Sequence, residues 1–169
     1  MQNKAFTLIL AASAVIVLII STLLAFPKVT KKEEEKTIPN NKPYVLINNK
    51  KINIEIADSN IKHQLGLSGR KELSKDSGML FIFPKDSYPL FWMKDMNFPL
   101  DLIWISDEKI VWINKNVPLP PANTRDENLK IYQSPKPVNY VLEINANQVD
   151  EFLFTTGMEV KFVNFNFDS

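Results

Sequence analysis

Residues 78–101, GMLFIFPKDSYPLFWMKDMNFPLD, place the strongest constraint on what this chain can fold into. Within this stretch, the short apolar and aromatic run at residues 79–83 is opened by a glycine and closed by a proline. A bounded run of this length is typical of a buried β-strand rather than a helix. Residues 90–94 and 100–105 are two further runs, and residues 96–99 between them predict a hairpin loop. The stretch therefore predicts three strands of a β-rich domain.

The third of these strands carries a carboxylate among apolar residues. Asp101 shares a face with Ile103, whereas Leu102 and Trp104 point the other way, so both faces of the strand are apolar. This pattern indicates burial on both sides. Because an isolated buried carboxylate is very costly, Asp101 needs a partner. If residues 96–99 are the hairpin loop, Lys94 lies directly opposite Asp101, and we expect the two to form a desolvated ion pair.

The chain from residue 44 onward continues with short apolar runs joined by short turns. Alternating isoleucines indicate that residues 51–57 form a half-buried strand, in a hairpin with residues 44–48. A two-residue turn at residues 107–108 leads into the strand at residues 110–113. The other predicted elements are helices near residues 59–65 and 146–154 and strands at residues 140–144 and 159–165. We therefore expect a mainly β (α+β) fold, a single compact antiparallel β-barrel or sandwich-like domain with two short helices.

The ends of the first predicted helix are marked in the sequence. Asp58 or Ser59 can cap it, and Gly66 can end it.

The sequence also predicts which way the residues of the first helix face and how the second helix begins. In the first, Ile61 and Leu65 are four residues apart and are expected to face the interior, while His63, the only histidine, faces solvent. In the second, Asn145 is the expected cap, and Gln148 three residues later completes a capping box.

The amino-terminal region has a different composition. Residues 5–26 are 22 apolar or uncharged residues, long enough for a helix to span the hydrocarbon of a bilayer. Because a signal peptide has a shorter apolar core, we favour an uncleaved transmembrane anchor over residues 1–26, with a cleaved signal peptide as the alternative. Residues 27–43 are charged and contain three prolines, which predicts a flexible linker. Residues 44–169 are then the mainly β domain.

The orientation of the predicted anchor rests on two opposing arguments. Lysines after the apolar run favour a cytoplasmic domain by the positive-inside rule. A long domain that follows an amino-terminal anchor is, however, usually exported, and long domains translocate largely regardless of charge. We expect a single-pass protein of the cell membrane with an extracytoplasmic domain.

Composition excludes several classes of site. The chain has no cysteine, which excludes disulfides and a lipid-modified cysteine, and with one histidine it offers no usual metal-ligand set. We expect neither a metal nor a cofactor. From residue 40 onward the chain holds 15 of the 20 basic and 16 of the 19 acidic residues, a net charge of −1. Nucleic-acid binding is not expected, because it depends on a basic surface.

Five motifs give the chain a resemblance to a known family. In order, they are GLSGR at residues 66–70, GMLFIFP at 78–84, FWMKDM at 91–96, FPLDLIWI at 98–105 and YVLEINA at 140–146. Together they resemble the bacterial and archaeal family called domain of unknown function 192, over roughly residues 44–163. The resemblance implies a single mainly β domain, often exported or membrane-anchored, with no established activity. Ser68 departs from the family pattern, which usually has methionine there.

A few charged and aromatic residues are candidates for chemistry. Arg70, Lys94, Asp101 and Glu143 are the charged residues set among apolar ones. Asp101 and Glu143 could be the paired carboxylates of a glycoside hydrolase, or they could be structural ions tied to Arg70 and Lys94. Trp92 could stack on a sugar or pack in the core. The candidate binding residues are therefore Arg70, Trp92, Lys94 and Asp101, and the weaker catalytic candidates are Asp101 and Glu143.

Two hypotheses for function follow. The first is a membrane-tethered extracytoplasmic binding or structural module that acts on a cell-envelope polymer or an envelope protein. The alternative is an envelope polysaccharide hydrolase that uses Asp101 and Glu143. Residues 116–130 form a long polar, proline-rich loop, which is expected to be the most mobile part of the domain and is either a binding edge or an excursion.

Overall fold

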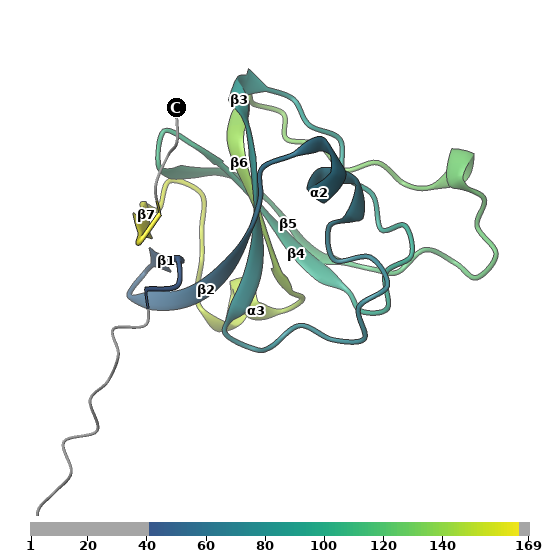
Figure 1. The fold of residues 1–169 in the computed structure, drawn as a ribbon, viewed down its shortest axis with the longest axis horizontal. Helices are drawn as coiled ribbons and strands as arrows, with labels where there is room; N and C mark the ends of the chain where they lie inside the picture. Colours follow the sequence, from purple (N-terminus) through teal and green to yellow (C-terminus); the bar gives the residue numbers. More distant parts are fainter. Residues whose placement is uncertain (1–40, 166–169) are drawn as a thin grey trace, which may run out of the picture. The chain divides into compact units, whose positions relative to one another are not determined.

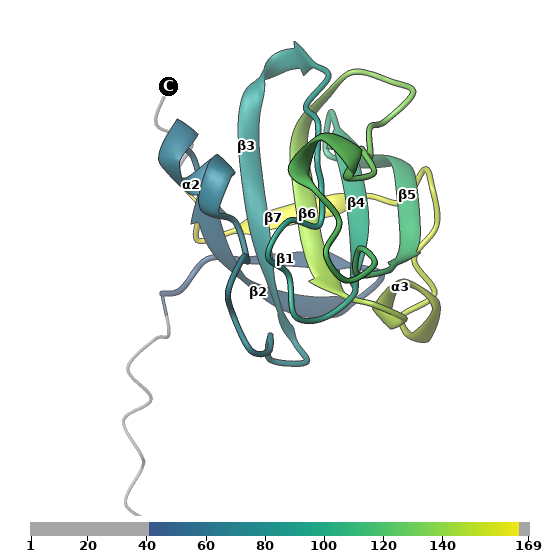
Figure 2. The same cartoon turned by 90° about the vertical axis from the view of Figure 1, so that its right-hand side faces the viewer.

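The computed structural model describes residues 41–165 (Figures 1 and 2). The predicted anchor at residues 5–26 and nearly all of the predicted linker at residues 27–43 lie outside the described residues. Within residues 41–165, no helix combines the length and the apolar character that crossing a membrane requires.

Seven strands and three short helical segments make up the described part of the chain. The strands are β1 (Tyr44–Ile47), β2 (Lys50–Ala57), β3 (Ser77–Ser87), β4 (Leu100–Ser106), β5 (Lys109–Val117), β6 (Val138–Asn145) and β7 (Val160–Val163). The helical segments are α2 (Asn60–Leu65), the 3₁₀ turn η1 (Asp126–Asn128) and α3 (Gln148–Glu151). The expectation of a mainly β domain with two short α-helices is confirmed.

The strands form one curled sheet in the order β5-β4-β6-β3-β2-β1-β7 (Figure 2). Its two edges meet at one end. The backbone N–H of Val160 donates to the carbonyl of Glu108 at 2.8 Å, and the N–H of Gly157 donates to the carbonyl of Ile110 at 2.7 Å. The curl therefore encloses one face of the sheet and leaves the other face to be covered by connecting segments.

One strand pair departs from the predicted antiparallel arrangement. β2 and β3 are parallel, with Asn53 opposite Ser77 and Ala57 opposite Phe81. Parallel neighbours need a crossover connection, and the segment between these strands supplies one that contains α2. Two of the three predicted hairpins are present, because β1 pairs with β2 and β4 pairs with β5, both antiparallel.

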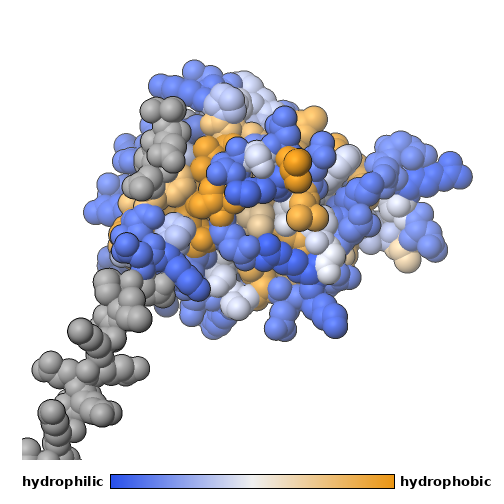
Figure 3. Space-filling view, in the orientation of Figure 1, coloured by the Kyte–Doolittle hydropathy of each residue, from blue (hydrophilic) through white to orange (hydrophobic). Residues whose placement is uncertain are grey.

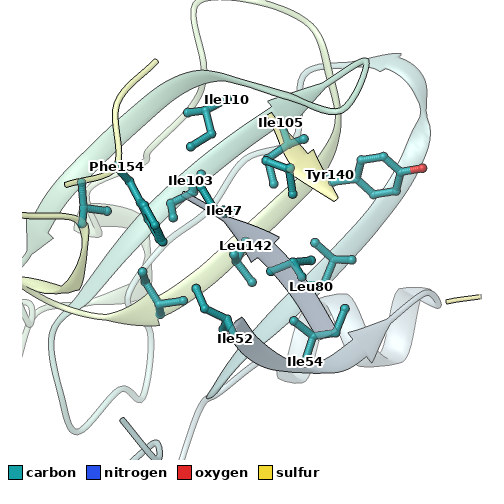
Figure 4. Packing of buried hydrophobic residues seen from close by; sticks show 14 of the residues in the cluster. Ile47, Ile52, Ile54, Leu80, Ile103, Ile105, Ile110, Tyr140, Leu142 and Phe154 are labelled. Atoms are coloured by element: carbon teal, nitrogen blue, oxygen red, sulfur yellow. The ribbon is translucent and has the colours of Figure 1, made fainter. Parts of the chain in front are cut away.

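The two faces of the sheet bury separate apolar clusters. We call the cluster inside the curl the inner core; it brings together side chains such as Ile47, Ile52, Leu80, Ile103 and Leu142 (Figure 4). We call the cluster on the other face the outer core; its buried members include Leu67, Phe81, Phe91, Leu102, Trp104 and Val141. Burial of both faces of β4, predicted from its apolar pattern, is confirmed.

The predicted strand at residues 90–94 does not form. Most of this segment lies in a loop across the outer core, held by Phe91, whose backbone exchanges hydrogen bonds of 3.0 and 2.8 Å with Tyr132. The reason is topological, because β4 already pairs with β5 on one side and β6 on the other and has no free edge. The predicted placement of Lys94 opposite Asp101 is therefore wrong.

α2 is present with the predicted cap, but its faces are reversed. The Ser59 side chain accepts from the N–H of Lys62, and Gly66 ends the helix with φ +48°. Ile61 and Leu65, however, are 79% and 62% exposed. His63 turns inward instead, where its Nε2–H donates to the carbonyl of Ala57 at 3.0 Å. A six-residue helix makes under two turns, so tertiary contacts rather than apolar spacing decide which side is buried.

α3 is shorter than predicted and has no capping box. The cap is Asn147, with φ +71° and no side-chain capping bond. The side chains of Asn145 and Gln148 reach back to the β2–β3 connection instead, where they donate to the carbonyls of Leu73 and Lys75, respectively. One backbone N–H of the first turn, that of Val149, is buried and donates to the carboxylate of Asp101 on a distant strand.

Candidate functional site

A cleft of about 400 Å³ opens on the outer face of the sheet, beneath α2. Its walls are α2 with the turn that follows it and the segment from Ser87 to Trp92, and its base is formed by β3 and β6. Five aromatic side chains line it: Phe81, Phe83, Tyr88, Phe91 and Trp92. Figure 3 shows apolar surface gathered on the face of the molecule that carries α2 in Figure 1. The cleft is within the size range of small-molecule sites.

Hydrogen bonds and a ring contact hold the walls of the cleft together. The hydroxyl of Ser68 donates to the carbonyl of Lys94 at 2.9 Å, and the N–H of Gly69 donates to the carbonyl of Asp95 at 2.8 Å. Phe91 packs edge-on against Phe81, with ring centroids 4.9 Å apart. These contacts fasten the turn after α2 and β3 to the loop before β4, so the walls of the cleft are joined to one another.

Glu143 of β6 lies at the base of this cleft. The sheet register places it between Met79 of β3 and Leu102 of β4, on the outer face. Its side chain is 5% exposed, and it makes neither a hydrogen bond nor an ion pair with any residue among those the structure describes. Burial raises the pKa of Glu143 to about 8, against the opposing effect of the Arg70 charge. At neutral pH the group is therefore mostly a neutral carboxylic acid facing an aromatic cleft.

The charge of Arg70 lowers the pKa of Glu143, but Arg70 forms its ion pair with another carboxylate, that of Glu55. Its guanidinium makes two parallel hydrogen bonds to Glu55 of β2, at 2.6 and 2.8 Å. This bidentate contact raises the pKa of Arg70 and lowers the pKa of Glu55. The backbone carbonyl of Arg70 accepts from the side chain of Asn97 at 2.9 Å, which fixes the segment that carries it.

Asp101 occupies the opposite face of the sheet. Its carboxylate is fully buried and accepts hydrogen bonds from the backbone N–H of Asn116 at 2.7 Å and of Val149 at 2.8 Å. Burial raises the pKa of Asp101, while these bonds and one from Asn147 act against that rise. The carboxylate thus ties the end of β5 and the start of α3 to β4. Because backbone N–H groups already satisfy the carboxylate, its role in the fold is structural and requires no ligand.

Lys94 is at the surface. It forms an ion pair with Asp126 of η1, which raises its pKa, and its ammonium lies 5.9 Å from the centre of the Trp92 ring. Trp92 itself is 47% exposed at the rim of the cleft. Trp104, by contrast, is fully buried in the outer core and donates to Asn114 at 2.8 Å.

Only some of the residues predicted to form the site lie in the cleft. Glu143 and Trp92 line the cleft, whereas Arg70 and Lys94 do not. Asp101 and Glu143 are on opposite faces of the sheet, so they do not form the carboxylate pair that flanks one glycosidic bond in hydrolases. Within residues 41–165, no group of three or more potential metal ligands lies together.

Sequence reasoning missed His63 and Phe83 as cleft residues. Both line the cleft, and their rings pack with centroids 4.5 Å apart and planes tilted by 37°. Glu143, by contrast, stood out in the sequence as the charged residue of the strand YVLEINA, with an apolar residue on either side. Nothing in the sequence indicated that α2 would turn His63 inward.

Comparison with known proteins identifies the family of the chain and finds solved structures with a similar fold. The model of the family DUF192, described as an uncharacterized ACR, matches residues 44–162, and the chain belongs to this family. A protein of unknown function from Novosphingobium aromaticivorans DSM 12444 has a similar structure, with a TM-score of 0.62 and 24% identity, over 70% of this chain and 83% of that one. A candidate transcription regulator from Sinorhizobium meliloti 1021 is also similar, with a TM-score of 0.63 and 26% identity, over 73% of this chain and 94% of that one. No curated protein matches the chain.

Proposed function

We propose that the domain is a small-molecule binding module whose ligand occupies the cleft beneath α2. The observation that carries this proposal is Glu143, a carboxyl group that is buried, lacks a hydrogen-bond partner among the described residues and faces an aromatic cleft. A buried polar group without a partner costs stability, and such a cost is typical of binding sites. A ligand that supplies the missing hydrogen bond would remove this cost.

The tryptophans provide a direct test. Trp92 at the cleft rim and Trp112 on β5 are similarly exposed, at 47% and 40%, but only Trp92 lines the cleft. The full-length chain labelled with fluorotryptophan is titrated with three probes that share one apolar stem: hexylamine, hexanol and hexanoate. We expect at least one probe to shift the Trp92 fluorine resonance to saturation and leave that of Trp112 in place. If no probe shifts Trp92 more than Trp112, the cleft is not a ligand site.

We also propose that the module is tethered to the cell membrane through residues 5–26, with the domain on the extracytoplasmic side, where a component of the envelope would be its ligand. The length and apolar character of residues 5–26 support the tether. Mass spectrometry of the membrane fraction should find these residues attached, and protease added to intact cells should digest the domain. A mature chain that begins at residue 26 or later would contradict the tether.

The other functions considered have less support. The hydrolase hypothesis needs two carboxylates on one face, and Asp101 and Glu143 are not so placed. The description of the Sinorhizobium relative concerns transcription, but the net charge of −1 from residue 40 onward does not favour nucleic-acid binding.

A further inference from the structure

We propose that the ligand of this cleft is a small-molecule amine, in which a cationic ammonium group on an apolar stem pairs with Glu143. This inference rests on the proposed binding function and names the chemical class of the ligand. It follows from three features of the cleft: its charge, its aromatic lining and its depth.

The charges around the cleft leave one acidic group to be neutralised. Arg70 is paired with Glu55, and Lys94 is paired with Asp126. Glu143 has no such ion pair among residues 41–165. When it ionises, the cleft therefore carries one buried negative charge, and a cation is the ligand group that complements it.

The walls also favour a cation. The faces of aromatic rings attract ammonium groups, most strongly where water is excluded. Phe83 and Phe91 approach each other edge-to-face, with ring centroids 6.1 Å apart, and both line the cleft together with Phe81. The exposed aromatic and aliphatic side chains at the rim, Tyr88, Leu90 and Trp92, supply apolar contact for a stem that extends outward.

The depth of Glu143 determines which end of the ligand enters the cleft first. Because its side chain is only 5% exposed, a cation that reaches it must leave water, and a charged group does so only when it finds an opposite charge. The ligand therefore enters with its ammonium leading and its apolar stem following. At neutral pH the carboxyl releases its proton to solvent as the ammonium binds, so the two charges form together.

This coupling predicts a pH dependence. The titratable and charged groups near Glu143 are His63 from α2, Tyr88 from the loop wall, and the Arg70–Glu55 pair. With the pKa of Glu143 at about 8, the ionised fraction rises from about 1% at pH 6 to about one half at pH 8. An alkylamine remains protonated across this range. Its affinity is expected to rise roughly 50-fold between pH 6 and pH 8, whereas that of hexanol stays constant or falls.

The Trp92 fluorine titration described above tests this inference. At pH 8 we expect hexylamine to bind at least about tenfold more tightly than hexanol, with hexanoate weakest. Glu143→Gln, which keeps the shape of the side chain, should abolish the preference for hexylamine over hexanol. Glu72→Gln is the matched control, because Glu72 is exposed and outside the cleft, and it should behave as the wild type.

The outcomes separate the two proposals. If hexanol binds as tightly as hexylamine, or if the preference survives in Glu143→Gln, the ligand is not an amine although the cleft still binds. If no probe shifts Trp92 selectively, the binding function itself is wrong. The pH dependence of the unmodified chain gives a second readout that needs no variant, and an amine affinity that does not rise from pH 6 to pH 8 overturns the inference.

Discussion

Asp101 and Glu143 are buried carboxyl groups on neighbouring strands of one sheet, yet their surroundings differ in every respect that matters for function. Asp101, on the inner face, accepts hydrogen bonds from the backbone N–H groups of Asn116 and Val149. Glu143, on the outer face, faces a cleft and makes neither a hydrogen bond nor an ion pair with a described residue. Burial alone therefore does not identify a functional carboxylate. What distinguishes the two is whether the fold itself satisfies the group.

The comparison assigns each residue a different role. Asp101 joins three elements that are distant in sequence, β4, the end of β5 and the start of α3, and its role is structural. Glu143 joins nothing in the fold and carries the cost of burial without compensation, so it is the better candidate for ligand contact. The following predictions test this contrast, from the largest expected effect to the smallest.

Asp101→Ala should destabilise the fold most. The change leaves the buried backbone N–H of Val149 and the part-buried one of Asn116 without their acceptor, at about 1–3 kcal/mol for a buried group, and removes packed atoms. We therefore expect a loss of about 3–5 kcal/mol in the free energy of unfolding. Urea denaturation measures it. Asp150→Ala is the control, since Asp150 is an exposed partner of Lys115 next to Val149 and should contribute less than about 1 kcal/mol. If Asp101→Ala lowers the free energy of unfolding no more than Asp150→Ala does, Asp101 does not have the structural role proposed for it.

Glu143 should make stability fall as pH rises. Its pKa is about 8 in the folded chain and near 4.5 when unfolded, so between these values the folded state binds more protons. Stability contributed by the protonated group is present below pH 4.5 and is lost as pH rises through 8. From pH 5 to pH 8 the loss is roughly 3 kcal/mol.

Glu143→Gln cannot ionise and should not show this loss, so the variant is expected to be more stable than the wild type at pH 8. Urea midpoints measured at several pH values compare the two, with Glu72→Gln as the control that retains the wild-type slope. Identical slopes for wild type and Glu143→Gln would show that Glu143 is not buried as an acid.

Arg70 and Glu55 should shift the pKa of Glu143 in opposite directions. Arg70→Gln removes a nearby positive charge, so the pKa of Glu143 should rise further. Glu55→Gln leaves the guanidinium without its bidentate partner, so its charge acts more strongly on Glu143, whose pKa should fall. Carbon-detected NMR of the Glu143 carboxyl group reports both shifts. Movement in the same direction for both variants would contradict the arrangement described here.

Lys94→Ala should have the smallest effect on stability. The ion pair of Lys94 with Asp126 is at the surface, where such pairs contribute little, and we expect a melting temperature close to that of the wild type. This result separates the observed structure from the hairpin predicted from sequence, in which Lys94 would be buried against Asp101. A loss comparable to that of Asp101→Ala would favour the hairpin.

Much of the fold could be predicted from local pattern. The apolar runs at residues 79–83 and 100–105, the turn at residues 107–108 and the glycine end of α2 are all present in the structure. These features depend on neighbours within a few residues, and local sequence contains that information. The family resemblance is likewise confirmed by the match over residues 44–162. The mobility predicted for residues 116–130 stays a prediction, although in Figure 1 most of this segment extends away from the sheet.

The candidate site could be predicted only in part. The sequence identified Glu143 as a polar residue in an apolar strand, and Asp101 as a buried carboxylate that needs a partner. It assigned the partner wrongly, because Lys94 is the nearest cation in sequence, whereas the groups that bind Asp101 are backbone N–H groups 15 and 48 residues away. Every residue except proline has a backbone N–H, so the composition of the chain does not indicate which of these groups will bind Asp101.

By itself, the sequence determined most of the strands and most of the side chains that these strands bury, and it showed that a buried charge needs a partner. Those properties follow from hydrophobicity, turn chemistry and the cost of removing charge from water. Only the tertiary structure decided which face of the sheet each carboxyl group occupies and what it meets there. In the sheet, β6 lies between β3 and β4. The register of β6 with β4 places Glu143 beside Leu102, which is on the outer face. Strand order depends on contacts between distant segments, so the contrast between a satisfied Asp101 and an unsatisfied Glu143 emerges only when the sheet is assembled.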